Sequence, residues 1–190
     1  LPDAHSAAPS GISAMLSGIV IGAGFFTLLR RLLVFTGTGL AAGELLIILA
    51  LITMSVGNLM AYSQLLHKQA DLKRILAYSS VAQMGYILLG VGVGLAYGIR
   101  VGYEGGLFHI MTHAFMKGLA FLCAGAIIHQ LGTRYVDEME GIGLSMKVTG
   151  FAFALSLLAL AGVPPLSGFM SEWMVFSGSI MTYGIIVLWG

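Results

Sequence analysis

The feature that most constrains the fold of this chain is a succession of apolar runs, most of them long enough to cross a bilayer. These runs lie near residues 11–31, 44–66, 75–97, 104–131, 148–163 and 168–189. An α-helix rises 1.5 Å per residue, so about 20 apolar residues span a hydrocarbon core of about 30 Å. Only 9% of the residues are charged, whereas soluble domains average about 25%. The sequence therefore predicts an all-α integral membrane protein, a polytopic bundle of transmembrane helices.

We expect the runs to form a single transmembrane domain over residues 1–190. Leu1 is not an initiator methionine and the chain ends inside an apolar run, which indicates a fragment of a longer chain. The nine Lys and Arg against eight Asp and Glu give a net charge of +1. Such a balance offers no basic surface for nucleic acid, so the expected surroundings are a lipid bilayer and other membrane subunits.

Lysine and arginine are unevenly divided between the two ends of the expected spans. If each run crosses once, one end carries Lys68, Lys73, Arg74, Arg134 and Lys147, and the other carries Arg30, Arg31 and Arg100. The positive-inside rule assigns the first group to the cytoplasmic side. We interpret Lys73 and Arg74 as anchors of the third helix at the lipid headgroups.

Three ionisable side chains recur every four residues within the run 104–131. On a helix this spacing stacks His109, His113 and Lys117 along one face, about 6 Å apart per step. Lys117 lies near the middle of the run, where an ammonium costs at least a few kcal/mol unless it has a partner or loses its proton. A lysine beside two imidazoles can load and release a proton, so the line predicts a proton or ion pathway.

Two other interpretations of this line remain open. Histidine and lysine can be structural groups that tie neighbouring membrane helices together. A metal or haem site is a further alternative, because His at i and i+4 can share a ligand. No His-Glu-x-x-His pattern is present, and His5, His67 and His129 lie near the ends of spans. We therefore predict neither a metal nor a cofactor, and the sequence offers no nucleophile and base pair for covalent catalysis.

A Gly-Pro-Pro segment interrupts the last apolar region. Pro164 and Pro165 remove backbone donors, so residues 162–168 cannot continue a regular helix. Such a break at membrane depth must be buried in protein or line a wet cavity. The sequence predicts either a discontinuous helix near Pro164 and Pro165 or an interfacial turn between two complete spans.

Glu172 follows this break within apolar sequence. A glutamate at a helix start can simply complement the helix dipole. Beside a broken helix it more often forms an ion or proton site, because free carbonyls and a cavity accompany the break. Other polar residues that could extend a hydrated path are Asp3, His5, Ser79, Ser80 and Gln83.

Four segments, in this order, resemble one family. They are residues 1–10 (LPDAHSAAPS), 71–86 (DLKRILAYSSVAQMGY), 108–117 (FHIMTHAFMK) and 162–172 (GVPPLSGFMSE). They are similar to the antiporter-type membrane subunits shared by NADH:quinone oxidoreductase (complex I), Mrp cation/proton antiporters and membrane-bound hydrogenases. The resemblance implies a fold of two inverted repeats, each with a discontinuous helix, of which this chain would cover the later part.

The resemblance also implies roles for individual residues. Lys117 would be the central lysine of a half-channel, His109 and His113 its hydrated neighbours, and Glu172 the terminal acid or base at the helix break. The subunit would move H⁺ or Na⁺ with other membrane subunits, in a prokaryotic cell membrane or an energy-transducing organelle membrane. Any redox centre would belong to those partners.

Gly22 departs from the family pattern. Many relatives have a lysine at this position, and that lysine links two half-channels. Its absence favours an alternative to the conducting subunit, namely a structural membrane subunit that does not conduct. A stand-alone cation/proton antiporter, which would need no partner subunits, is a further alternative.

Overall fold

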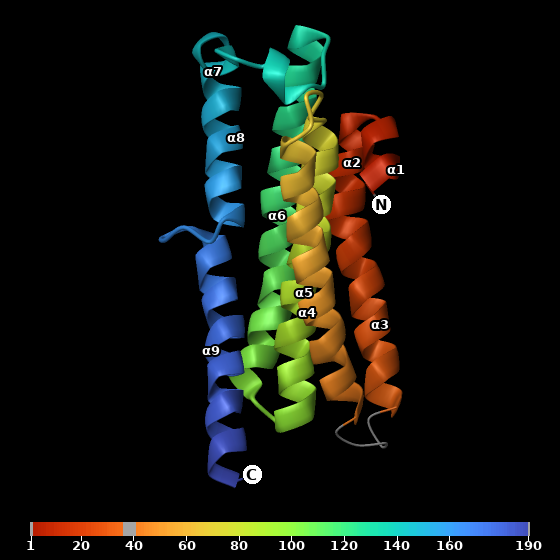
Figure 1. Ribbon diagram of the computed structural model, residues 1–190, viewed down its shortest axis with the longest axis vertical. Coiled ribbons are helices and arrows are strands. Elements are labelled where there is room, and N and C mark those ends of the chain that lie inside the picture. The colour runs from red at the N-terminus through yellow and green to blue at the C-terminus, as the bar shows by residue number, and fades with distance from the viewer. Residues whose placement is uncertain (1, 36–40, 190) are drawn as a thin grey trace.

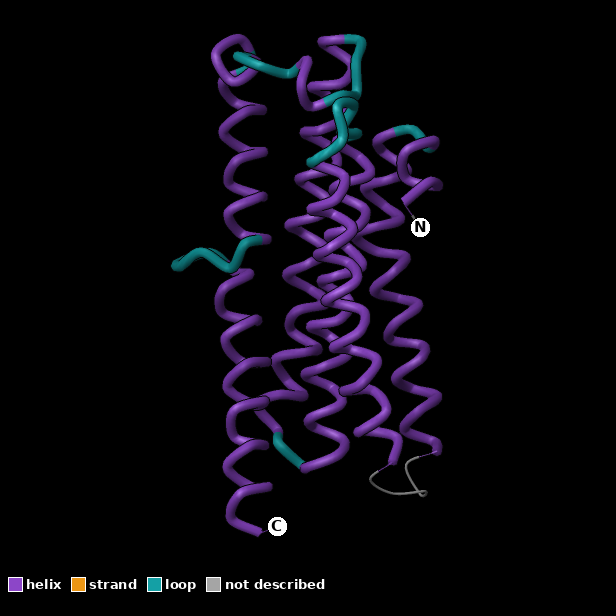
Figure 2. The backbone as a smooth tube through the Cα atoms, viewed as in Figure 1, coloured by secondary structure: helices purple, strands orange, loops and turns teal. Residues whose placement is uncertain are grey.

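The computed structural model describes residues 2–35 and 41–189, and the regular structure in these residues is helical (Figures 1 and 2). The elements in chain order are α1 (Pro2–Ala7), α2 (Ser10–Met15), the π-helix η1 (Leu16–Val20), α3 (Ile21–Phe35), α4 (Ala41–Leu65), α5 (Leu72–Tyr97), α6 (Arg100–Leu131), the 3-10 helix η3 (Val136–Glu138), α7 (Ile142–Ser145), α8 (Lys147–Leu160) and α9 (Ser167–Trp189). The described residues contain four helical stretches long and apolar enough to cross a membrane, namely Ser10–Leu32, Ala42–Leu65, Leu72–Tyr97 and Arg100–Leu131. The prediction of an all-α membrane protein is confirmed.

The first of these stretches is one column made of α2, η1 and α3. It continues to Phe35, beyond the end predicted near residue 31, although Arg30 and Arg31 lie in its last part. Both arginines are exposed. Long cationic side chains can reach an interface while the backbone remains helical, so a pair of arginines does not by itself end a membrane helix.

α5 lies inside the bundle and α4 at its edge. In the most apolar part of α5, 61% of the residues are buried, against 17% in α4. α4 instead exposes large apolar side chains such as Leu45, Ile48 and Leu59. Glycines let the helices approach closely, since a Cβ added to Gly90 of α5 would lie 2.6 Å from the carbonyl oxygen of Gly102 in α6. Small residues at helix contacts are typical of membrane bundles.

α5 begins at Leu72, earlier than the predicted start near residue 75, because Asp71 caps it. The Asp71 carboxylate accepts hydrogen bonds from the backbone N–H groups of Lys73 (2.9 Å) and Arg74 (3.3 Å). A side-chain acceptor at the N-cap satisfies donors that the helix leaves unpaired. The side chain of Lys73 is 7% exposed, and its ammonium donates to the carbonyl of Ala8 at 2.9 Å. The interpretation of Lys73 as a headgroup anchor is therefore wrong.

α6 also starts earlier than predicted. The predicted run begins near residue 104, whereas α6 begins at Arg100, which pairs with Glu104 one turn later at 2.6 Å. Ion pairs at i and i+4 are compatible with a helix and slightly stabilise it. The 32 residues of α6 make it the longest helix in the described residues.

The Gly-Pro-Pro segment separates α8 from α9, which lie end to end along α6 while residues 161–166 protrude between them (Figure 1). Gly162 adopts a φ of 66°, a left-handed conformation that glycine tolerates best. α8 has only 14 residues, fewer than a complete membrane span needs. α8 and α9 thus follow one another in the same direction along α6.

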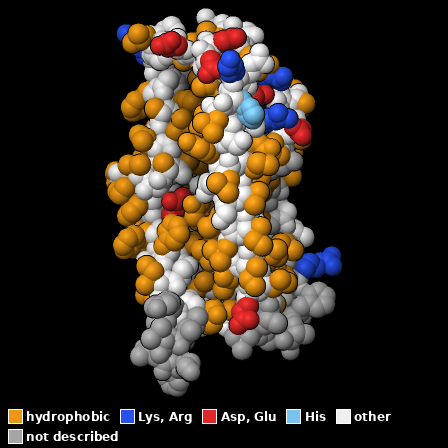
Figure 3. Space-filling view, in the orientation of Figure 1, with side chains coloured by type: hydrophobic (Ala, Val, Ile, Leu, Met, Phe, Trp, Pro, Cys, Tyr) orange, Lys and Arg blue, Asp and Glu red, His pale blue; other side chains and the backbone are white. Residues whose placement is uncertain are grey.

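Most charged side chains on the face seen in Figure 3 lie toward its two ends, one acidic side chain lies near its middle, and apolar side chains cover most of the rest. The connection before α5 and the segment after α6 lie at one end, while α3 finishes at the other end (Figure 1). This distribution suits a bundle that crosses a bilayer lengthwise. Which end faces the cytoplasm stays a prediction.

Candidate functional site

The core of the candidate site is a buried ionisable line on α6. His109 and Lys117 are 0% exposed and His113 is 1% exposed. The two imidazole centroids lie 6.3 Å apart. α5 and α9 contribute the polar partners of this line, because both pack against the same face of α6.

His109 has hydrogen-bond partners on both ring nitrogens. Its Nε2 lies 2.5 Å from Oε1 of Gln83 on α5, and its Nδ1 lies 2.9 Å from Oγ of Ser171 on α9. The Gln83 amide is oriented by its NH₂ group, which donates to the carbonyl of Leu160 at 3.2 Å. Because Oε1 can only accept, the proton between Gln83 and His109 belongs to Nε2. In a neutral His109 the Nδ1 atom then accepts from Ser171.

Ser171 was not among the candidates drawn from the sequence. It is fully buried, and its hydroxyl also lies 3.0 Å from Oγ1 of Thr112 on α6. A small polar residue next to Glu172 in an apolar helix was the available signal. Serine is common at membrane helix contacts, however, so residue type alone does not distinguish a site residue from packing.

Glu172 lies where α8 ends. The Gln83 NH₂ group is 3.5 Å from Oε1 of Glu172, the limit of a hydrogen bond. A Cβ added to Gly162 would collide with the Glu172 carboxylate. Glycine at this position therefore makes room for the carboxylate, and Gln83 lies between it and His109.

Lys117 is held by neutral oxygen atoms. Its ammonium donates to the carbonyl of Leu76 at 2.7 Å and to the hydroxyl of Ser79, both on α5. The salt bridges found among the described residues pair other cations, and none involves Lys117. Lys117 can therefore lose its proton without leaving a buried carboxylate unpaired, which favours reversible protonation.

Two buried imidazoles near Lys117 lack partners. In the described part of the chain, Nε2 of His113 and both ring nitrogens of His5 have no hydrogen-bond partner. His5 is 0% exposed and stacks on Phe121 of α6 with ring centroids 5.0 Å apart. Buried unpaired polar groups cost free energy and are uncommon, so their presence calls for an explanation.

Asp3 is not part of this buried region. Its side chain is 84% exposed and forms a salt bridge with Arg74. The hydrogen bond and charge of Arg74 lower the pKa of Asp3 below its usual range. Its membership of a pathway stays a prediction.

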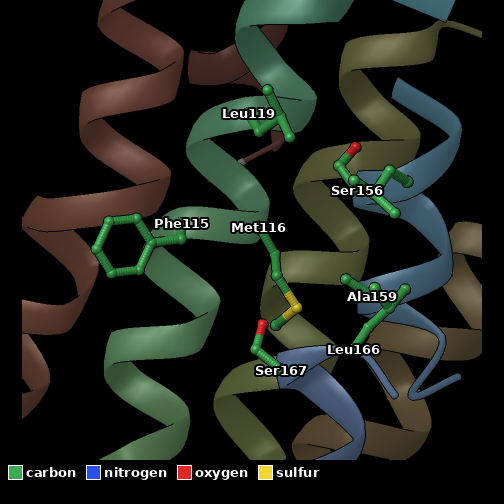
Figure 4. Close-up of a pocket in the computed structure, with 8 residues that line it drawn as sticks. Phe115, Met116, Leu119, Ser156, Ala159, Leu166 and Ser167 are labelled. Atoms are coloured by element: carbon green, nitrogen blue, oxygen red, sulfur yellow. The ribbon is translucent and has the colours of Figure 1, made fainter. Parts of the chain in front are cut away.

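A cavity of about 170 Å³ adjoins the helix break but holds none of the line's ionisable groups (Figure 4). Its lining consists of Phe115, Met116, Leu119, Leu155, Ser156, Ala159, Leu166 and Ser167. Two hydroxyls among apolar side chains offer few partners for ordered water. This cavity lies between α6, α8 and α9 and is lined mainly by apolar side chains.

Gly22 lies on α3 beside a shallow apolar groove against α6. A Cβ added there would lie 3.0 Å from the end of the Ile110 side chain.

Within residues 2–35 and 41–189, no three His, Cys, Asp or Glu side chains are grouped as metal ligands.

A polytopic helical bundle with a buried line of ionisable side chains is the arrangement found in membrane proteins that move ions or protons. The model of the NADH:quinone oxidoreductase/Mrp antiporter transmembrane family matches residues 1–190, and the chain belongs to that family. The resemblance drawn from the four motifs is thereby confirmed, and the protein is a multi-pass membrane protein.

Individual relatives agree with this assignment. The chain is 41% identical over 184 residues to hydrogenase-4 component B of Escherichia coli (strain K12), a match that covers 91% of this chain and 26% of that protein. Its fold is similar to a chain of the Mrp complex from Dietzia sp. DQ12-45-1b, with a TM-score of 0.86, 28% identity and coverage of 98% of this chain and 33% of that one. It is also similar to a chain of the membrane-bound sulfane sulfur reductase, an archaeal respiratory membrane complex. The TM-score is 0.80 and the identity 30%, and the match covers 94% of this chain and 35% of that one.

The chain thus spans about a quarter to a third of the length of these relatives. The solved relatives come from multisubunit membrane complexes.

Proposed function

We propose that this chain is the proton- or cation-translocating part of an antiporter-like subunit in a respiratory, hydrogenase or Mrp-type membrane complex. Protons move along the line formed by Lys117, His113 and His109 and reach Glu172 at the helix break. Transport proceeds by protonation and deprotonation of side chains, without covalent catalysis. Each proton that moves changes the charge next to the following site, and this electrostatic coupling links distant chemistry or an ion gradient to transport.

The observation that carries the proposal is the burial of three ionisable side chains along one face of α6. The side chain of Gln83 contacts both His109 and Glu172 and so extends this line to the helix break. Helix contacts alone require fewer and less costly polar groups, since Ser and Thr hydroxyls can bond to their own helix backbone. We further propose that α8 and α9 together form a discontinuous transmembrane helix, and that the chain is the later part of an inverted-repeat fold.

The test measures proton and sodium uptake by liposomes that contain the full assembled complex. Lys117→Ala should lower the transport rate at least about a hundredfold, because a general acid and base group is lost. Glu172→Gln keeps the side-chain volume and removes only the ionisation, and it should have a comparable effect.

The matched controls are Lys68→Ala and Glu140→Gln, which make the same changes at exposed positions. Both should transport like the parent. Unchanged transport in Lys117→Ala and Glu172→Gln, with assembly intact, would refute the proposal. The buried side chains would then be structural groups that hold neighbouring helices together.

The second candidate function is a structural membrane subunit that does not conduct, and Gly22 is the observation that favours it. The position where many relatives carry a linking lysine has no ionisable group here. A third candidate, the stand-alone cation/proton antiporter, differs from the first in needing no partners. If the protein purifies without partner subunits and exchanges ions in liposomes, the third candidate is established. The proposal that the chain is part of a complex subunit is then refuted.

A further inference from the structure

An apolar layer separates Lys117 from one end of the bundle. It contains buried Ala14, Leu72, Leu76, Ala77, Ala120, Phe121 and Ala124. On α6 it starts just beyond Lys117, and on α5 it reaches back to the residue after the Asp71 cap. A proton that leaves Lys117 toward this end must cross the layer, and apolar side chains cannot carry it.

Beyond the layer, at the start of α5, lies a cluster of charged and polar groups. The Asp71 carboxylate accepts a hydrogen bond from Ser6 at 2.6 Å and lies 3.5 Å from Nε of Arg134. Asp3 and Arg74 pair beside it, both partly open to solvent. These groups can exchange protons with water at the surface.

His5 is a titratable side chain that contacts the layer. It lies on α1, is fully buried, and stacks on Phe121. The hydroxyl of Ser13 donates to the backbone carbonyl of His5 at 3.1 Å and so fixes the position of this short helix. Both ring nitrogens lack partners among the described residues, which leaves one free to accept a proton and the other free to donate one.

The charges around His5 suit transient protonation. Burial lowers the pKa of His5, and the nearby cations, including Lys117 on α6 and Lys73 on α5, lower it further. The neutral imidazole is therefore favoured whenever Lys117 carries its charge. When Lys117 gives up its proton, one of these opposing charges disappears, and the imidazolium becomes easier to form.

We propose that His5 is the proton relay across the apolar layer, connecting Lys117 with the polar cluster around Asp71. In the transfer an N–H bond of the Lys117 ammonium breaks and an N–H bond forms on the His5 imidazole, directly or through a water molecule. The imidazolium then releases a proton from its other nitrogen toward the cluster, and Lys117 is reprotonated from the His113 side. Charge and protons balance at each step. This inference rests on the proposed function.

The alternative role for His5 is packing, and His5→Phe separates the two. Phenylalanine preserves a ring that can stack on Phe121 and fills a similar volume, but it cannot bind a proton. In liposomes with the full assembled complex, His5→Phe should lower proton uptake at least about tenfold at unchanged assembly. His5→Gln, smaller and polar but not titratable at neutral pH, should give the same loss. The control His129→Phe, at an exposed histidine of α6, should transport like the parent.

Parent-like transport in either assembled His5 variant would overturn the relay. If Lys117→Ala abolishes uptake while His5→Phe does not, the relay alone fails and the proposed function stands. If Lys117→Ala itself transports normally, the proposed function fails, whatever the His5 variants do.

Discussion

The two halves of the buried line on α6 differ in how completely their polar atoms are paired. Around His109, both ring nitrogens have partners and the Gln83 amide is fixed by a backbone carbonyl. Around His113 and His5, three ring nitrogens are buried without a partner in the part of the chain that the structure describes. A fully paired network holds one geometry, whereas unpaired groups are available to bind a proton or water. The comparison indicates a fixed half next to the helix break and a reactive half near Lys117.

The largest expected effect on stability comes from breaking the fixed half with Gln83→Leu. This change leaves the His109 Nε2–H group and the Leu160 carbonyl without the partner they share, at a cost of about 1–3 kcal/mol for each unsatisfied buried group. We expect a lower thermal midpoint of the purified complex and roughly tenfold slower proton uptake.

Gln130→Leu is the control for Gln83→Leu, because Gln130 is an exposed glutamine of α6. It should change neither the midpoint nor the uptake. A Gln83→Leu variant that is as stable and active as the parent would show that the fixed half contributes little.

His113→Leu sharpens the comparison in the reactive half. Its Nε2 has no partner among residues 2–35 and 41–189, so replacing the imidazole with an apolar side chain removes an unpaired buried group and should leave the thermal midpoint unchanged or raise it. Proton uptake should nevertheless fall about tenfold or more, because a titratable group of the line is lost. A midpoint that falls together with uptake would contradict the distinction between the two halves.

The smallest effect is expected at the surface, for Asp3→Asn. Arg74 lowers the pKa of Asp3, so this pair stabilises the fold above the ordinary carboxyl pKa and ceases to do so as the pH falls through the lowered value. Because both partners are partly exposed, the pair contributes little to stability at pH 7, and proton uptake at this pH should be unchanged. Measuring the thermal midpoint from pH 7 to about 3 should show a slightly weaker acid dependence than in the parent.

Asp137→Asn, at an exposed carboxylate outside the cluster, is the control for the acid titration. A large loss of proton uptake in Asp3→Asn would place Asp3 within the pathway.

Spacing along one helix was enough to predict that His109, His113 and Lys117 share a face, because helical periodicity is local. The same reasoning was wrong for Lys73. A cation next to an arginine at a helix start resembles a headgroup anchor, and only the packing of α1 against α5 turned its ammonium toward the Ala8 carbonyl. Ser79 and Gln83 were named only as possible extensions, since their partners lie on other helices.

The sequence by itself determined a helical membrane protein, its family, the buried ionisable line and the break at Pro164 and Pro165. These features follow from run lengths, composition and short motifs, which are properties of consecutive residues. Only the tertiary structure decided that Gln83 joins His109 to Glu172, that Ser171 completes the network and that His5 enters the apolar layer. The physical reason is that a buried polar group is defined by which partners reach it, and those partners come from helices far apart in the chain.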